Sequence, residues 1–115
     1  MCTGDSISTG YGNECPASAL KKYDPKMENA YQSYGAMTAR ALSAELRIAA
    51  WGGKGICKNF DQTQGNTMPV IWGKVLPRWA PAVDWNFSAW QPHVVVVNLG
   101  VNDFTSELFY PSQLV

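Results

Sequence analysis

The sequence lacks an excess of charge of either sign, because nine Lys and Arg residues balance nine Asp and Glu residues. A chain without net positive charge has no bulk attraction for phosphate backbones or anionic lipids, so nucleic acid is not expected as a partner. No apolar run approaches the roughly 18 residues that cross a bilayer. The sequence therefore predicts neither a nucleic-acid-binding protein nor a membrane-spanning segment.

Histidine and cysteine are also scarce. The sequence has one histidine, His93, and three cysteines, Cys2, Cys15 and Cys57, with no C-x-x-C pair. Because these residues do not assemble into a convincing zinc site, we expect no metal ion. A Cys15–Cys57 disulfide is permitted by the sequence, although the odd cysteine count leaves at least one thiol free.

The composition and the spacing of apolar residues predict one small globular domain of alternating helices and strands. The chain has 115 residues, of which 46% are apolar and 16% charged, enough for a single core. Glycine, asparagine and proline make residues 4–27 mostly loop and turn. A capping-box arrangement at Asn29, followed by apolar residues at steps of three and four, predicts a helix over residues 30–46. Further expected elements are strands over 47–51 and 94–100, the second covered on both faces, and a short helix over 68–76.

Small polar residues cluster where the strands of this α/β arrangement are expected to end. The clusters are Asp5-Ser6, the glycine loop 52–55, and Asn102-Asp103. Open α/β sheets place their sites at the carboxyl ends of the strands. A serine on a glycine turn exposes its hydroxyl, a glycine N–H can approach a reacting oxygen, and a carboxamide can donate to it. The residues of each cluster are also common in turns, so a purely structural role stays open. Trp51 is expected in the core rather than in a site.

Three sequence blocks resemble a known family. "GDSIS" at 4–8, "WGGKG" at 51–55 and "NLGVND" at 98–103 are similar, in order and spacing, to the first three blocks of the SGNH or GDSL hydrolases. "GYGNE", "MENAYQSYGAMTARAL", "GKGICKNF" and "TMPVIWGKVLP" resemble the acetyl esterases of carbohydrate esterase family two. This resemblance implies a flavodoxin-like three-layer α/β sandwich with a parallel sheet.

The same resemblance implies roles for individual residues. Ser6 would be the nucleophile, and its backbone N–H, the N–H of Gly53 and the carboxamide of Asn102 would form the oxyanion hole. The expected activity is removal of acetyl groups from carbohydrate esters such as plant polysaccharides, by a secreted enzyme that needs no cofactor. GDSL lipases and esterases that act on other short-chain esters share these blocks, so that alternative stays open.

The sequence departs from the family pattern at both ends. The family histidine usually comes from a late D-x-x-H block, which this sequence does not contain. His93 precedes a strand roughly 23 Å long, so it should lie at the opposite sheet edge from Ser6 and is not expected to be the base. Only residues 1–3 precede Gly4, so the first strand, which in the family lies between the other two, is expected to be nearly absent.

These departures lead to an alternative expectation for the chain as a whole. Residues 1–115 would form a partial SGNH hydrolase domain with blocks I to III only, incomplete in fold and impaired in catalysis. Strands without a full complement of neighbours expose unpaired backbone groups, so we expect the chain to associate into a homo-oligomer.

Overall fold

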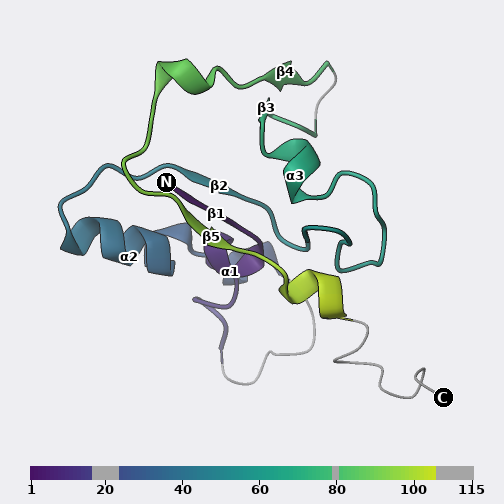
Figure 1. The fold of residues 1–115 in the computed structure, drawn as a ribbon. Helices are drawn as coiled ribbons and strands as arrows, with labels where there is room; N and C mark the ends of the chain where they lie inside the picture. Colours follow the sequence, from purple (N-terminus) through teal and green to yellow (C-terminus); the bar gives the residue numbers. More distant parts are fainter. Residues whose placement is uncertain (17–23, 79–80, 106–115) are drawn as a thin grey trace.

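The structure, a computed structural model, describes residues 1–16, 24–78 and 81–105 (Figure 1). Its centre is a parallel sheet of β1 (Cys2–Gly4), β2 (Ile48–Ala50) and β5 (Val96–Asn98). The strand order is β2-β1-β5, and the middle residue of β1, Thr3, lies opposite Ala49 on one side and Val97 on the other. The chain is therefore an α/β protein, as the alternation of elements predicts.

The central strand β1 corrects the expectation that the first strand is nearly absent and that its two neighbours lack a shared partner. Three residues are sufficient to join β2 and β5, because hydrogen bonds to both neighbours continue at the start of β1. The Met1 amino group donates to the Val94 carbonyl (2.8 Å), and the Cys2 N–H donates to the Arg47 carbonyl (2.9 Å). Gly4 ends the strand where a Cβ atom would lie 2.6 Å from the Asn98 carbonyl oxygen. Only a glycine lets the chain turn so close to β5.

A short helix follows β1, where residues 4–27 were expected to be mostly loop. This helix, α1 (Ser6–Thr9), begins after Asp5, whose Oδ1 accepts a hydrogen bond from the Ile7 N–H (3.0 Å), and ends at Gly10 with φ 85°. The same segment contains a 3₁₀ turn, η1 (Pro25–Met27). Residues 17–23 of the expected loop lie outside the described residues.

The helix expected over residues 30–46 is two separate elements. Asn29 caps only a 3₁₀ turn, η2 (Ala30–Gln32), by accepting from the Tyr31 N–H (3.1 Å). Ser33 then adopts an extended backbone (φ −67°, ψ 155°) and caps α2 (Tyr34–Ala41). The predicted length is wrong at both ends. Ser33, with a buried side chain, starts the helix anew just before the first apolar residue of the pattern, and the helix ends at Ala41, two residues before Ser43 adopts a left-handed backbone (φ 50°).

The segment between β2 and β5 holds more regular structure than expected. Helix α3 (Met68–Ile71) has Pro69 in its first turn, as predicted, but ends before residue 76 because strand β3 (Lys74–Val75) begins. β3 pairs antiparallel with β4 (Val83–Asp84), and a 3₁₀ turn, η3 (Phe87–Ala89), leads back to the sheet. A last 3₁₀ turn, η4 (Val101–Phe104), follows β5.

Strand β5 is shorter and more exposed than expected. It covers Val96–Asn98 rather than 94–100, and Val96 and Val97 are 43% and 61% exposed, so the expected cover on both faces is wrong for the described residues. The helix α1 packs beside β1 and β2, which leaves the valines of the outer strand open to solvent.

Three further expectations concern the disulfide, a membrane-spanning helix and a metal site. The permitted Cys15–Cys57 disulfide is not formed, since both thiols are free. None of the described helices is long and apolar enough to cross a membrane. The described residues also contain no cluster of three or more His, Cys, Asp or Glu side chains that could hold a metal ion.

Candidate active site

The three residues predicted to form the site line one cavity of about 610 Å³. Ser6 follows the end of β1, Gly53 follows the end of β2, and Asn102 follows the end of β5. Because these strands are parallel and adjacent, their carboxyl ends meet at the same edge of the sheet. Residues separated by almost the whole length of the chain are therefore neighbours.

Ser6 is the first residue of α1 and is half-buried in the cavity wall. Its carbonyl oxygen accepts hydrogen bonds from the Thr9 hydroxyl (2.9 Å) and the Tyr11 N–H (2.9 Å), which fix the turn. Within the described part of the chain, neither the Ser6 hydroxyl nor its N–H is bonded to another group. Both remain available to a molecule in the cavity.

Gly53 contributes backbone to the wall of the same cavity. Its φ of 77° lies in the left-handed region, which favours glycine over other residues. The Gly53 carbonyl accepts from the Phe60 N–H (2.8 Å), whereas its own N–H has no acceptor among residues 1–16, 24–78 and 81–105. The loop therefore presents an unused donor at this position.

Asn102 is buried, with 5% of its surface exposed. Its Nδ2 donates to the Lys54 carbonyl (2.9 Å) and lies 3.4 Å from Asp5 Oδ2. The second contact is longer than the ordinary range for an N–H···O hydrogen bond, about 2.7–3.2 Å. One amide hydrogen is thus firmly held, and the other is engaged only weakly.

Asp5 lies beneath the site and is completely buried. Burial raises the pKa of this carboxyl group above its ordinary value, and the hydrogen bond from the Ile7 N–H opposes that rise. The side chain caps α1 and contacts the Asn102 amide, so it connects the serine turn to the turn after β5.

Sequence reasoning missed several polar and aromatic residues of the cavity wall, among them Trp51, Tyr11, Glu28 and Phe60. Trp51, expected in the core, lines the cavity and is only half-buried. Tyr11 and Glu28 reach the cavity because an isolated antiparallel bridge joins them across 17 positions of the chain, a pairing with no local sequence signal. Phe60 is brought in by its hydrogen bond to Gly53.

The structure places His93 away from Ser6, as strand geometry predicts. His93 precedes β5, whose first residue pairs with Cys2 at the start of β1, whereas Ser6 follows the end of β1. It lines a different cavity, beside α2. The cavity that contains Ser6 has no histidine among its described lining residues.

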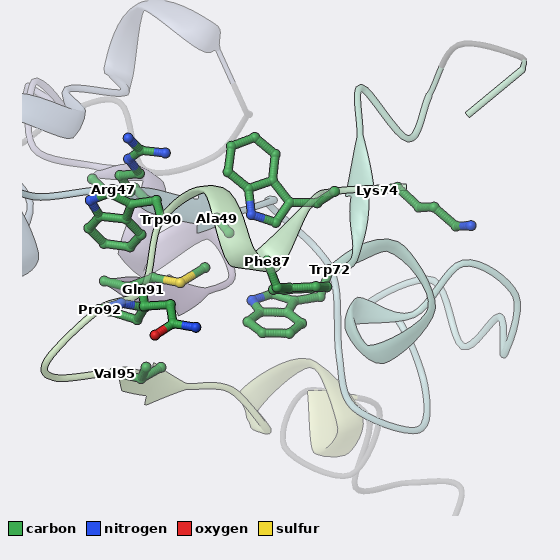
Figure 2. Close-up of a pocket in the computed structure, with 12 residues that line it drawn as sticks. Arg47, Ala49, Trp72, Lys74, Phe87, Trp90, Gln91, Pro92 and Val95 are labelled. Carbon is green, nitrogen blue, oxygen red and sulfur yellow. The ribbon is translucent and has the colours of Figure 1, made fainter. Parts of the chain in front are cut away.

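A separate aromatic cavity of about 380 Å³ lies at the beginning of β2 (Figure 2). Trp72 stacks on Phe87 with ring centroids 5.0 Å apart, and the Arg47 guanidinium lies 4.5 Å from the Trp90 ring centroid. None of the three predicted site residues lines it. The cavity at the carboxyl ends of the strands is therefore the candidate active site.

Comparison with known proteins agrees with this geometry. The model of the GDSL-like lipase/acylhydrolase family matches residues 2–113, nearly the whole chain. The chain belongs to this family. The expected resemblance to SGNH or GDSL hydrolases is confirmed.

Individual relatives point to carbohydrate esterases. The chain is 43% identical over 103 residues to the cellulase/esterase CelE of Acetivibrio thermocellus, covering 90% of this chain and 12% of that protein. It is 30% identical over 106 residues to an acetylxylan esterase / glucomannan deacetylase of Cellvibrio japonicus, covering 91% of this chain and 29% of that protein.

The solved structures to which the chain is similar are also carbohydrate esterases. A family two carbohydrate esterase from Clostridium thermocellum, determined in complex with cellohexaose, superposes with a TM-score of 0.82 at 42% identity, covering 91% of this chain and 31% of that one. A family two carbohydrate esterase from Cellvibrio japonicus superposes with a TM-score of 0.81 at 28% identity, covering 90% and 31%. The chain therefore spans less than a third of the length of these relatives.

Proposed function

We propose that this chain carries the nucleophile and oxyanion hole of an esterase that removes acetyl groups from carbohydrate esters. The observation that supports the proposal most strongly is the convergence of an unbonded serine hydroxyl, the unbonded N–H of Gly53 and the Asn102 amide on one cavity. The matched relatives are named as an esterase and as acetylxylan esterases, which supports the substrate class.

The proposed reaction begins with attack of the Ser6 Oγ on the acetyl carbonyl carbon. The negative charge that develops on the carbonyl oxygen is stabilised by the N–H groups of Ser6 and Gly53 and by the weakly engaged N–H of Asn102. The bond between the carbonyl carbon and the sugar oxygen then breaks, the sugar leaves as an alcohol, and an acetyl group remains on Ser6. Water hydrolyses this acyl-enzyme and releases acetate.

Proton removal from Ser6 needs a base, and no histidine lies at the described part of this cavity. Without a histidine beside Ser6, we expect turnover by residues 1–115 to be slow. The alternative of a catalytically impaired fragment describes the same situation, because loss of one member of a serine triad can cost about a millionfold in kcat. Acetyl transfer to Ser6 from an activated ester is consequently the better measurement than turnover.

Aromatic side chains around the cavity favour a sugar over a long acyl chain. Tyr11, Trp51 and Phe60 line it, and flat aromatic rings can pack against the C–H face of a pyranose. Glu28, on the same wall, can accept hydrogen bonds from sugar hydroxyls. We propose that the enzyme is secreted and acts on this substrate outside the cell.

Competition distinguishes a carbohydrate esterase from an esterase for other short-chain esters. Acetylated xylo-oligosaccharides should slow the acetylation of Ser6 by an aryl acetate, whereas ethyl octanoate at equal concentration should leave it unchanged. Acetylation is followed by intact-protein mass spectrometry, with unacetylated oligosaccharide as the control for solvent effects. Equal protection by ethyl octanoate would favour the wider lipase or esterase alternative.

We also propose that the chain self-associates through the open side of its sheet. The strands β2 and β5 share the neighbour β1, contrary to the expectation from the sequence, but β5 is an outer strand of the three described and its valines are exposed. Exposed apolar edge strands are prone to pair with another chain. Sedimentation velocity should show a dimer or larger species at micromolar concentration, and Val97→Lys should shift it toward monomer. A folded wild-type monomer throughout would exclude this proposal.

A further inference from the structure

The carboxylate of Asp103 lies inside the loop that follows β2. Its Oδ1 accepts hydrogen bonds from the N–H groups of Cys57 (2.6 Å) and Lys58 (3.0 Å), and its Oδ2 accepts from Ile56 (2.9 Å). Asp103 itself is 8% exposed. Three successive backbone N–H groups that converge on one anion form a nest, an arrangement that binds negative charge strongly.

The loop is shaped closely around this carboxylate. A Cβ atom on Gly55 would clash with the Lys58 carbonyl and would lie 2.7 Å from Asp103 Oδ2, so only glycine fits there. The Met68 N–H donates to the Gly55 carbonyl (2.9 Å), which holds the far side of the loop against α3. The loop conformation and the position of Asp103 therefore depend on each other.

Asp103 is also adjacent in sequence to a residue that holds the first half of the loop. Asn102 donates to the carbonyl of Lys54, which directly follows Gly53. The two side chains of the turn after β5 thus fix the loop at Lys54 and again at residues 56–58. The segment between β2 and these contacts contains Gly53, which has a left-handed backbone, lines the cavity and has no acceptor for its N–H among the described residues.

We propose that Asp103 is a positioning residue that holds the glycine loop so that the Gly53 N–H faces the acyl oxygen on Ser6. This inference rests on the proposed function only in taking Gly53 as an oxyanion donor. Asp103 does not touch the substrate, because it is enclosed by the loop and does not line the cavity. Hydrogen bonds to a charged carboxylate are roughly twice as strong as those between neutral groups, so a charged residue suits this role.

The isosteric variant Asp103→Asn provides the test of loop position. It keeps the side-chain shape but removes the charge and turns an N–H donor toward at least one backbone N–H. Amide hydrogen exchange of Ile56, Cys57 and Lys58, measured by NMR, should accelerate at least about tenfold, while exchange of the β1 amides stays unchanged. Asp61→Asn is the matched control, since Asp61 is an exposed carboxylate that accepts from the N–H and hydroxyl of Thr63 in the neighbouring turn.

The second readout measures the consequence for chemistry. Asp103→Asn should slow the maximum rate of Ser6 acetylation by an aryl acetate at least about tenfold, with little change in the ester concentration that gives half that rate. Asp61→Asn should change neither quantity. A wild-type chain that is not acetylated at Ser6 would count against the proposed function, yet the exchange measurement would still decide whether Asp103 holds the loop.

Two outcomes of the Asp103→Asn experiments would overturn the inference. One is unchanged exchange at residues 56–58 in Asp103→Asn, and the other is faster exchange with unchanged acetylation of Ser6. If the variant also loses protection in β1, the wild type provides an independent measurement. Its amide protons at residues 56–58 should then shift together as a single carboxyl group titrates, and Asp61→Asn should leave that shift in place. Independent movement of the three protons would exclude the arrangement.

Discussion

Ser6→Ala is expected to abolish acetyl transfer from an aryl acetate to the cavity, from one acetyl group per chain to none. The wild-type hydroxyl attacks the ester carbonyl, the aryloxide leaves, and the proton passes to solvent. Deacylation needs a base to activate water, and no histidine lies at the described part of this cavity, so the acetyl-enzyme should accumulate. Intact-protein mass spectrometry then detects the mass of one added acetyl group.

Controls separate Ser6 from background acetylation of lysines. Ser88→Ala removes an exposed serine hydroxyl that donates to Asn86 Oδ1 (2.7 Å) within its own turn, and should leave the acetylation unchanged. Peptide mapping should locate the acetyl group on the peptide that contains Ser6, and hydroxylamine should remove it as an ester. Equal, hydroxylamine-resistant acetylation of wild type and Ser6→Ala would remove the basis for a nucleophilic Ser6.

Asn102→Ala should slow acetylation of Ser6 by about a hundredfold or more. Removal of one oxyanion donor typically costs about 2.7–4 kcal/mol in the transition state. The substitution also leaves the Lys54 carbonyl without the hydrogen bond that Asn102 donates to it. The measurement is the rate of acetyl transfer at saturating aryl acetate, with circular dichroism to establish that the variant is folded.

A matched control and one further measurement decide how Asn102 acts. Asn86→Ala removes an exposed carboxamide that caps η3, outside the Ser6 cavity, and should leave the rate unchanged. If exchange of the amides at residues 56–58 is the same in Asn102→Ala as in the wild type, loss of a donor rather than loosening of the loop explains the slower rate. An Asn102→Ala rate within twofold of wild type would contradict the role of this amide.

The candidate site could be predicted from short local patterns in the sequence. Glycine on either side of Asp5-Ser6, the glycine loop after an apolar run, and Asn102 after four consecutive valines are local patterns with local physical causes. The rule that sites lie at the carboxyl ends of parallel strands then predicted their proximity. The predictions of Ser6, Gly53 and Asn102 as neighbours needed no knowledge of the intervening chain.

Element lengths and cavity walls could not be predicted in the same way. The central strand was missed because three residues give no periodic signal, and its stability comes from partners 46 and 94 positions away. The length of the helix was overestimated because the apolar spacing continues past Ala41, where the helix ends, and because the backbone of Ser33 is extended rather than helical. Tyr11 and Glu28 share the cavity through one bridge between distant segments, which no local pattern indicates.

The sequence by itself determined which groups can act as a nucleophile or as hydrogen-bond donors. They are one serine on a glycine turn, one glycine loop and one asparagine after a strand of consecutive valines. Only the tertiary structure decided which of their hydrogen-bonding groups stay unused, and that Asp103 is enclosed by the N–H groups of a loop 45–47 positions earlier. The reason is physical: residue type sets what a side chain can donate or accept, whereas the choice of partner is made by segments that meet only when the sheet forms.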